Sequence, residues 1–416
     1  MSSADPSIRR FAGFASDWAA KGVLLGVVCA LSSLLLRGGT PDVFDFWAVW
    51  MRRVQTFGLT ESYSRFYTDY PPGSVSLLAL ARAVLPGSDF WSIKMLLGAF
   101  LLGAGLVTGL WLRDVVAATV MIAALAVNAV GLGYLDVLYA VPLLLALWAL
   151  QRDRVALFSV FFATACLVKW QPVILIPFVI VFLLRSLVAE RGTLNTRRIA
   201  AALVPGLSVS AVVVLAFGLR AVAHAFRLGL TQPFLSGNAL NLGWLLTALE
   251  RGSLDNGKPV TFVFLPDVPS WMPTLTRSLF ALAMLVILAA FWRGARTFEQ
   301  LLAASIIGVV AYFSFNTGVH ENHLFLACLL SVIGLWLLPG LRTLLLIVIA
   351  ITQVNLIAFY GLTGTLDNSP TLSGIDATIP LAALTLLACC FVVIRTLPYI
   401  AASRAVLAEV PKGQAD

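Results

Sequence analysis

The sequence predicts an all-α polytopic membrane protein with about twelve transmembrane helices and amphipathic surface helices in two long loops. Of its 416 residues, 60% are hydrophobic and only 12% are charged, and the mean hydropathy is +0.94. The core of a soluble protein does not need this much apolar surface, so the composition is typical of an integral membrane protein. No internal repeat or soluble domain interrupts the pattern, and we treat residues 1–416 as one transmembrane domain.

The predicted spans are apolar segments, several of them shorter than the roughly 20 residues that a helix needs to cross about 30 Å of hydrocarbon. They lie near residues 20–36, 92–112, 115–131, 134–150, 155–168, 171–185, 199–219, 275–292, 299–316, 323–338, 342–360 and 377–394. The first follows basic residues and resembles a signal peptide, but no small-residue cleavage site follows it. We therefore interpret it as an uncleaved anchor.

Basic residues predict the orientation, because short cytoplasmic loops are enriched in Lys and Arg. With the N-terminus inside, the short cytoplasmic connections contain Arg113, Arg152, Arg154, Arg185, Arg191, Arg197, Arg198, Arg293, Arg296 and Arg342, and the C-terminal end contains Arg395, Arg404 and Lys412. Lys169 is the one basic residue of the short outer connections. This predicts a plasma (inner) membrane protein with both termini inside and two extracytoplasmic loops, residues 37–91 and 220–274.

Composition also indicates which classes of partner the protein binds. The net charge of +8 is accounted for by cytoplasmic Lys and Arg, so we expect membrane lipid and no nucleic acid as a partner. The chain has no GxxxxGK[ST] or GxGxxG phosphate loop, which argues against an internal nucleotide site. The five cysteines lie within apolar segments, which indicates packing residues rather than a disulfide framework.

The loop 37–91 is the first long interruption of the apolar pattern, and it concentrates acidic residues. These are Asp42, Asp45, Glu61, Asp69 and Asp89. A carboxylate beside a bilayer is costly unless it is solvated or used, so this concentration suggests a site. We expect Asp42 to cap an amphipathic helix that ends at Gly58 and lies on the membrane surface with its tryptophans on one face.

The loop continues with a rigid turn, Asp69-Tyr70-Pro71-Pro72-Gly73. The apolar run that follows, to Leu85, has roughly 13 residues and is too short to span the bilayer, so we expect it to dip in and return. Asp69 and Tyr70 belong to this acid-rich loop, and we predict that they contact the substrate.

Asp42 and Asp45 are the candidate catalytic residues. A carboxylate at the membrane surface can accept a proton from a hydroxyl nucleophile. The alternative is that Asp42 only caps the helix and Asp45 is a first-turn acid favoured by the helix dipole. The residues themselves leave both interpretations open.

Two charged residues at outer junctions are candidate binding residues. Asp136 follows a tight turn between two spans, where an isolated acid is often simply solvated. Lys169 lies between two apolar runs, either as an interfacial lysine that extends to solvent or as a cation for a lipid phosphate. Reading 155–185 as a single helix would place the Arg185–Arg198 cluster outside, so we predict two short helices that meet at Lys169-Trp170-Gln171-Pro172.

A cluster of His and acid residues occupies a late outer loop. His320, Glu321 and His323 lie within four positions, but a third metal ligand would have to come from elsewhere and no HExxH motif exists, so we expect no metal and no cofactor. We favour phosphate contact by His320, with Glu321 setting its orientation. In the second long loop, Asn238 and Asn241 either bind sugar hydroxyls or cap and satisfy the loop helix.

The ordered set of motifs resembles a known family. The set comprises an early loop Asp, a Trp-bearing surface helix, FYxxDYPPG from Phe66, the turn Asp136 before an LxYxxxLLLAL run, the Lys-Trp-Gln-Pro junction, Asn-Ala-Leu-Asn-Leu from Asn238, and Gly-Val-His-Glu-x-His ending at His323. It is similar to polytopic glycosyltransferases of the GT-C superfamily, especially bacterial relatives of the second GPI mannosyltransferase and of dolichyl-phosphate-glucose glucosyltransferases. The similarity covers about residues 20–340.

The resemblance implies an enzyme that transfers a hexose, with mannose favoured, from a polyprenyl-phosphate sugar to an acceptor hydroxyl on the extracytoplasmic face. The acceptor would be a glycan, a glycolipid or a protein hydroxyl, and a first-loop Asp would be the general base. Three features depart from the family pattern. Asp42 and Asp45 stand eight and five residues before Trp50, whereas the family usually spaces them by seven; Asn322 replaces a frequent cation; and Gly243 interrupts the Asn-Leu-Trp run. The alternative is a transporter or lipid flippase, although ionisable residues here gather in loops rather than at the membrane midplane.

Overall fold

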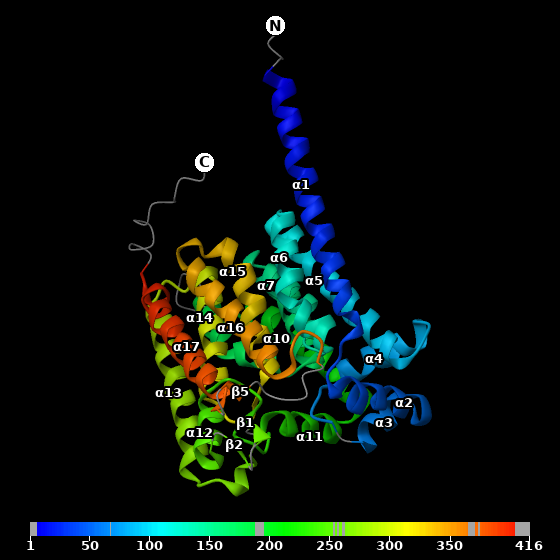
Figure 1. Cartoon of the computed structure of the whole chain (residues 1–416). Coiled ribbons are helices and arrows are strands. Elements are labelled where there is room, and N and C mark those ends of the chain that lie inside the picture. The colour runs from blue at the N-terminus through cyan, green and yellow to red at the C-terminus, as the bar shows by residue number, and fades with distance from the viewer. Residues whose placement is uncertain are drawn as a thin grey trace.

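The computed structural model describes residues 6–66, 68–187, 195–252, 254–255, 258–259, 263–364, 371–372 and 375–403. Within these ranges the chain forms a bundle of helices, with long helices packed side by side and shorter ones gathered at one end (Figure 1). The strands found in these ranges are three two-stranded pairings of two residues each. The predicted fold class, an all-α membrane protein, is confirmed at this level.

The first half of the chain forms α1 (Pro6–Leu34), η1 (Leu35–Arg37), η2 (Val43–Trp47), α2 (Ala48–Phe57), α3 (Leu59–Arg65), α4 (Pro72–Val84), α5 (Asp89–Leu112), α6 (Val115–Ala126), η3 (Val127–Leu132), α7 (Val137–Gln151), α8 (Val155–Val168), η4 (Gln171–Leu175) and α9 (Ile176–Leu187). The second half forms α10 (Thr196–Phe217), α11 (Leu219–Leu230), β1 (Ser236–Gly237), α12 (Leu242–Arg251), β2 (Leu254–Asp255), β3 (Lys258–Pro259), η5 (Leu265–Asp267), α13 (Trp271–Arg293), α14 (Phe298–Phe315), β4 (Val319–His320), η6 (Glu321–Leu324), α15 (Phe325–Leu337), η7 (Pro339–Leu341), α16 (Arg342–Tyr360), β5 (Thr371–Leu372), β6 (Ile375–Asp376) and α17 (Thr378–Ala401).

Eight helices of the described ranges are long and apolar enough to cross a membrane. They are Ala19–Arg37, Asp89–Leu112, Val115–Leu132, Thr196–Phe217, Trp271–Arg293, Phe298–Phe315, Pro339–Tyr360 and Thr378–Ala401. Shorter apolar helices are Pro72–Val84, Val137–Gln151, Val155–Val168, Gln171–Leu184 and Glu321–Leu337. The first of these is the run predicted to dip into the bilayer. The other four coincide with the predicted spans 134–150, 155–168, 171–185 and 323–338. The protein is thus a membrane-embedded helical bundle, and the count of twelve spans stays a prediction.

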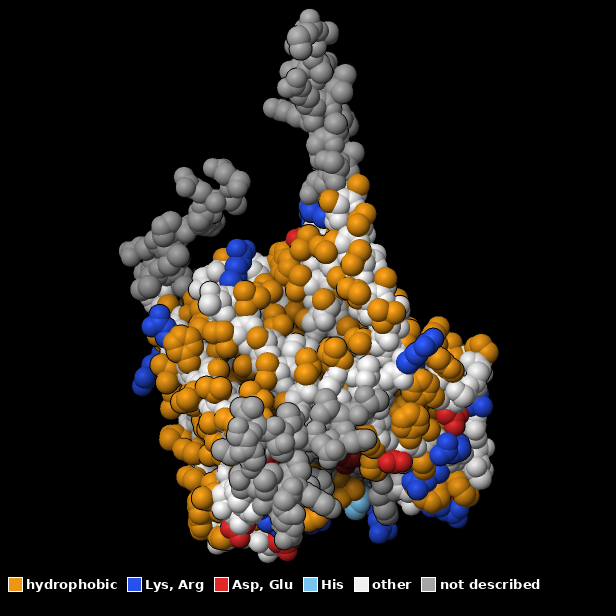
Figure 2. Space-filling view, viewed as in Figure 1, with side chains coloured by type: hydrophobic (Ala, Val, Ile, Leu, Met, Phe, Trp, Pro, Cys, Tyr) orange, Lys and Arg blue, Asp and Glu red, His pale blue; other side chains and the backbone are white. Residues whose placement is uncertain are grey.

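The bundle has a buried centre and an apolar outer surface. In α14, 83% of the apolar window is buried within the protein, whereas α1 and α10 each bury only 6%. Exposed leucines, valines and isoleucines lie on the outer helices, and hydrophobic side chains dominate the flank seen in Figure 2. In a soluble protein such a surface would favour aggregation, but lipid tails cover it at no cost.

The two ends of the bundle differ in the residues they present. The α7–α8 turn contains Arg152 and Arg154, and α8 ends beside Lys169 at the other end of the hairpin. Both described chain ends lie at the top of Figure 1, and α2, α3, α11 and α12 lie at the bottom. This arrangement matches the predicted one, with short basic turns at one end and both long loops at the other. Arg191, Arg404 and Lys412, which entered the orientation prediction, lie outside the described residues.

The junction at Lys169 is folded as predicted. The helix α8 stops at Val168, Lys169 is extended with φ −149° and ψ 142°, and η4 begins at Gln171. Pro172 occupies the first turn of η4, where its missing N–H costs nothing. The break places the Lys169 side chain between two helix ends rather than on a continuous helix face.

The prediction that Asp42 caps the loop helix is wrong. Asp42 is itself helical, with φ −54° and ψ −36°, and makes no capping hydrogen bond. The chain enters the helix one residue earlier through Pro41 and then widens into the π-helical turn η2. The predicted end at Gly58 is confirmed by its φ of 79°. Without a capping task, the Asp42 carboxylate is available for another role.

We expect the loop end of the bundle to face the extracytoplasmic side. Cysteines placed at Ser64 and Ser270, both exposed, should react with a membrane-impermeant maleimide added to intact cells. Asn256 would be a further choice in the second loop, but it lies outside the described residues. Labelling of both cysteines only after permeabilisation would reverse the topology.

Candidate functional site

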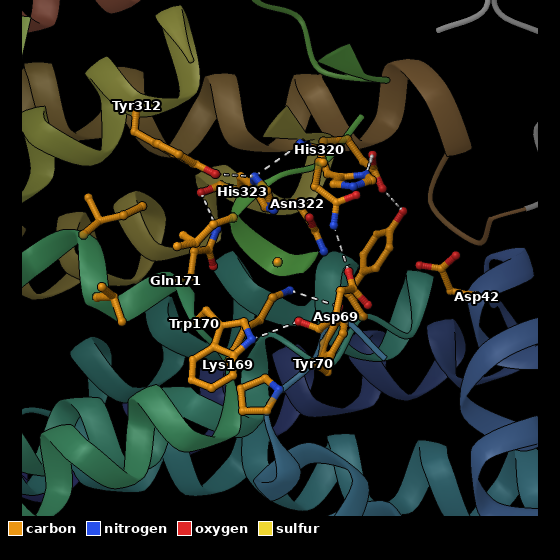
Figure 3. Close-up of a pocket in the computed structure, with 18 of the residues that line it drawn as sticks. Asp42, Asp69, Tyr70, Lys169, Trp170, Gln171, Tyr312, His320, Asn322 and His323 are labelled. Atoms are coloured by element: carbon orange, nitrogen blue, oxygen red, sulfur yellow. Dashed lines mark hydrogen bonds and ion pairs between the residues drawn. The ribbon is translucent and has the colours of Figure 1, made fainter. Parts of the chain in front are cut away.

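A cavity of about 480 Å³ lies at the loop end of the bundle, where both long loops meet the helix ends. Its lining residues come from segments that are far apart in the chain, and Figure 3 shows most of them directed toward one another. The polar lining residues are Asp42, Asp69, Tyr70, Tyr134, Lys169, Gln171, Gln232, Tyr312, His320, Glu321, Asn322 and His323. The apolar and aromatic ones include Phe46, Trp47, Trp50, Trp170, Val173, Ile174, Pro177, Phe280 and Met284.

Aromatic rings fix one wall of the cavity. The ring centroids of Trp47 and Trp50 are 4.9 Å apart, and that of Tyr70 lies 5.1 Å from Trp47 and 5.5 Å from Trp50. The three rings meet edge to face, a favoured geometry that joins the loop helix α2 to the Asp-Tyr-Pro-Pro-Gly turn. The wall therefore fixes the position of Asp42 relative to Asp69.

Asp42 is the least bonded acid of the cavity. No described residue donates a hydrogen bond to its carboxylate, and in Figure 3 it stands apart from the bonded residues. Burial raises its pKa to about 6, an effect that the Lys169 charge opposes and that Asp69 adds to. A carboxylate with this pKa is ionised at neutral pH and is a stronger base than a solvated Asp.

Lys169 is held by an acid of the protein itself. Its Nζ lies 2.6 Å from Oδ1 of Asp136 and 3.3 Å from the hydroxyl oxygen of Tyr70, and 5.0 Å above the Tyr70 ring. Asn322 donates from Nδ2 to the other oxygen of Asp136 at 2.9 Å. Asp136 is fully buried and is the helix-start residue of α7. The site thus contains its own anion for Lys169, so burial of this lysine does not by itself require a lipid phosphate.

Asp69 is also bonded. Its Oδ2 accepts a hydrogen bond of 3.0 Å from Nε2 of Gln232, and its carbonyl accepts one of 3.0 Å from Nε1 of Trp170. Burial raises the pKa of Asp69, and the hydrogen bonds and the Lys169 charge work against that rise. These contacts tie the first loop to the second loop and to the Lys169 junction.

The histidine cluster is anchored by a short parallel strand pair. Ser236 pairs with Val319 and Gly237 with His320, so the second loop crosses directly behind the cluster. The backbone N–H of His320 donates to Nδ1 of His323 at 3.2 Å. Because that nitrogen is the acceptor, the proton of neutral His323 is on Nε2.

Glu321 and His320 complete the cluster. The Tyr134 hydroxyl donates to Oε1 of Glu321, and Oε2 of Glu321 lies 3.9 Å from Nδ1 of His320. Burial, with a contribution from Lys169, lowers the pKa of His320 to about 4. His320 is therefore neutral at physiological pH and can donate a hydrogen bond to a ligand but adds no positive charge.

Four predicted site residues, Asp45, Asp136, Asn238 and Asn241, lie outside the cavity lining, and Asp136 is buried behind it as the partner of Lys169. Asp45 is exposed and does not line the cavity. Asn241 is fully buried: its Oδ1 accepts from Trp244 N at 3.0 Å, and its Nδ2 donates to the Phe313 carbonyl at 2.9 Å. Asn238 donates to the Tyr360 hydroxyl at 2.9 Å. The two asparagines thus have the helix-capping and loop-stabilising contacts that the sequence offered as their alternative role.

Other lining residues carry polar groups that the sequence did not single out. Gln171 accepts from the Tyr139 hydroxyl at 2.8 Å and donates to the His323 carbonyl at 2.9 Å. Tyr134 and Tyr312 each contact a member of the histidine cluster. Polar residues immediately beside a predicted site residue, such as Gln171 beside the Lys169 junction, are the signal that could have identified them.

Among the described residues, no group of three or more His, Cys, Asp or Glu side chains is placed to hold a metal ion. No protein-family model matches the chain, and no curated protein matches it. The geometry of the cavity therefore carries the functional argument alone.

Proposed function

We propose that this protein is an integral membrane glycosyltransferase that moves a hexose, with mannose favoured, from a polyprenyl-phosphate sugar to an acceptor hydroxyl on the extracytoplasmic face. The main support is that Asp42, a partly buried carboxylate without a bonding partner among the described residues, lines the same cavity as Lys169 and the histidine cluster. A base and several hydrogen-bond donors facing one space are what sugar transfer from a phosphate requires.

The cavity wall suits a donor with a lipid tail. Val173, Ile174 and Pro177 line it from η4 and α9, and Phe280 and Met284 line it from α13. The outer faces of these helices expose apolar side chains, as expected where they meet lipid. In this arrangement the isoprenoid tail lies against the apolar wall and the sugar phosphate against the polar one.

The reaction is a single displacement. The Asp42 carboxylate takes the proton of the acceptor hydroxyl, and the acceptor oxygen bonds to the anomeric carbon as the bond from that carbon to the phosphate oxygen breaks. The electron pair of the broken bond leaves with the phosphate, so no further reactant is needed. Attack from the face opposite the phosphate inverts the anomeric configuration.

Donors for the departing phosphate come from Lys169 and the histidines. An ammonium group has three N–H bonds, and the contacts of Lys169 with Asp136 and Tyr70 use two. The third, together with N–H groups of neutral His320 and His323, can donate to phosphate oxygens. Because His320 is neutral, the phosphate contact predicted for it is a hydrogen bond and adds no positive charge.

Turnover should depend on the ionisation of Asp42. Because the base must be deprotonated and burial raises its pKa to about 6, the catalytic constant should rise as pH increases through about 6 and level off above it. His320, with a pKa lowered to about 4, stays neutral over this range and does not contribute. Steady-state kinetics at saturating donor would measure the profile; a rate that stays flat or falls through this range would remove Asp42 as the base.

The donor class is tested directly with purified protein in detergent. It is incubated with a panel of radiolabelled polyprenyl-phosphate sugars and, separately, with nucleotide sugars, and lipid and non-lipid products are extracted. We expect label to move only from polyprenyl-phosphate sugars. Transfer from nucleotide sugars alone would refute the proposal, and movement of an unchanged lipid-linked sugar across a vesicle membrane without transfer would support a flippase.

A further inference from the structure

The helix formed by α6 and η3 ends directly behind the segment that contains Asp42. Its last turn is π-helical, and the chain leaves it at Gly133, which has a φ of 83°. A helix end leaves four carbonyl groups without partners inside the helix, and buried carbonyls must be bonded elsewhere. Here the carbonyls to account for are those of Val130, Gly131, Leu132 and Gly133.

Lys94 donates to the first two of these carbonyls. Its Nζ donates to the Val130 carbonyl at 2.8 Å and lies 3.5 Å from that of Gly131. The side chain is fully buried in α5, no carboxylate of the described residues pairs with it, and its Nζ lies 5.5 Å from the centre of the Phe90 ring. An ammonium in an apolar bundle is expensive, and a helix C-terminus is one of the few places that stabilises it.

The segment that contains Asp42 donates hydrogen bonds to the other two carbonyls. The backbone N–H of Thr40 donates to the Leu132 carbonyl at 2.9 Å and the Thr40 hydroxyl at 3.2 Å, and Nε1 of Trp47 donates to the Gly133 carbonyl at 3.1 Å. These contacts flank Asp42 on both sides. Val43 also packs so closely on Gly133 that a side chain there would collide with it.

We infer that Lys94 is a positioning residue for Asp42: by bonding the Val130 and Gly131 carbonyls it fixes the last turn of η3, and that turn holds the segment from Thr40 to Trp47 against the cavity. Both partners of this contact are π-helical turns, η3 and η2. Such turns are rare and occur often at functional sites. The effect on turnover rests on the proposed function, whereas the docking of the segment does not.

Lys94 acts on Asp42 through the backbone rather than through its charge. The charged groups with the largest influence on Asp42 are Lys169, Asp69, Asp45 and Asp136. Removal of the Lys94 donors would leave two buried carbonyls unbonded, and the turn would have to rearrange to reach other donors. The acceptors for Thr40 and Trp47 would move with it.

The test measures docking without relying on activity. Val43, which is fully buried, is changed to Cys, and its modification by a soluble maleimide is followed by mass spectrometry of the peptide that contains it. We expect the rate to rise at least about tenfold when Lys94→Met is added, and much less with Lys94→Arg, which keeps donors at this position. Thr40→Val removes one hydroxyl contact and keeps Lys94, so it should give a smaller rise in the modification rate. If Lys94→Met does not fold, the rate in Thr40→Val tests the docking instead.

Thr108→Val is the matched control. Thr108 is a fully buried residue of the same helix whose hydroxyl has no hydrogen-bond partner in the described structure, so its loss should leave the Val43 site protected. Equal protection of the introduced thiol in all variants, or equal exposure with Thr108→Val, would overturn the inference.

A kinetic readout separates a positioning role from general loss of folded protein. If Lys94→Met undocks the Asp42 segment, Asp42 becomes more solvated, and the acid limb of the turnover profile should move from about pH 6 toward the ordinary carboxyl range. A merely destabilised protein would lose activity with an unchanged limb, and that result would contradict the positioning role. Absence of glycosyl transfer in wild-type protein would refute the proposed function but leave the maleimide result interpretable.

Discussion

Replacement of Asp42 by Asn should lower the turnover of the purified enzyme by at least about a hundredfold while donor binding survives. Asn has nearly the same shape as Asp but cannot accept the proton of the acceptor hydroxyl. Since the Asp42 carboxylate has no bonding partner among the described residues, the change should disturb the fold little. A hundredfold loss corresponds to about 2.7 kcal/mol of transition-state stabilisation.

Asp45→Asn is the matched control for this experiment. The two acids lie one turn apart in the same helical segment, and both were candidates for the base, but Asp45 is exposed outside the cavity. We expect Asp45→Asn to keep near-normal turnover. Near-normal turnover of Asp42→Asn at saturating substrate, or the larger loss with Asp45→Asn, would assign the base elsewhere.

Lys169→Met should destabilise the protein by about 3–5 kcal/mol, because it leaves the Asp136 carboxylate buried without its counter-charge. The two side chains are only 10% and 0% exposed, so water cannot replace the lost partner. Turnover should fall as well, since the donor phosphate loses the cation beside it. Thermal unfolding in detergent and steady-state kinetics measure the two effects separately.

The double variant Lys169→Met with Asp136→Asn separates the structural role of Lys169 from its role in turnover. A neutral Asn at position 136 no longer needs a cation, so most of the lost stability should return while turnover stays low. Full recovery of turnover in the double variant would show that Lys169 serves only to neutralise Asp136. Unchanged stability in the Lys169→Met single variant would contradict the buried ion pair itself.

The sequence was most informative where local chemistry decides the structure. The Pro172 turn and the basic residues that follow predicted the break at Lys169, and Gly58 predicted the end of the loop helix; both are confirmed. The helix predicted in the second long loop likewise forms, as α12, and Asn241 is its cap. These features depend on residues within a few positions of one another.

Features that depend on distant contacts could not be predicted. Asn322 reaches Asp136 across 186 positions, and β1 pairs with β4 across more than eighty, so no local pattern identified either contact. In the family pattern Asn322 marks the loss of a cation, whereas in the structure it bonds the acid that neutralises Lys169. The π-helical turn that follows Asp42 has no local sequence signature, so the sequence could not show that Asp42 lies inside the helix rather than at its cap.

Transfer of label from a polyprenyl-phosphate hexose to an acceptor, measured with wild-type protein and Asp42→Asn side by side, tests the central claim most directly. We predict that the wild type forms a glycoside whose anomeric configuration is inverted relative to the donor, and that Asp42→Asn binds the donor but forms at least about a hundredfold less product. A product with retained configuration, or equal product from both proteins, would contradict single displacement with Asp42 as the base.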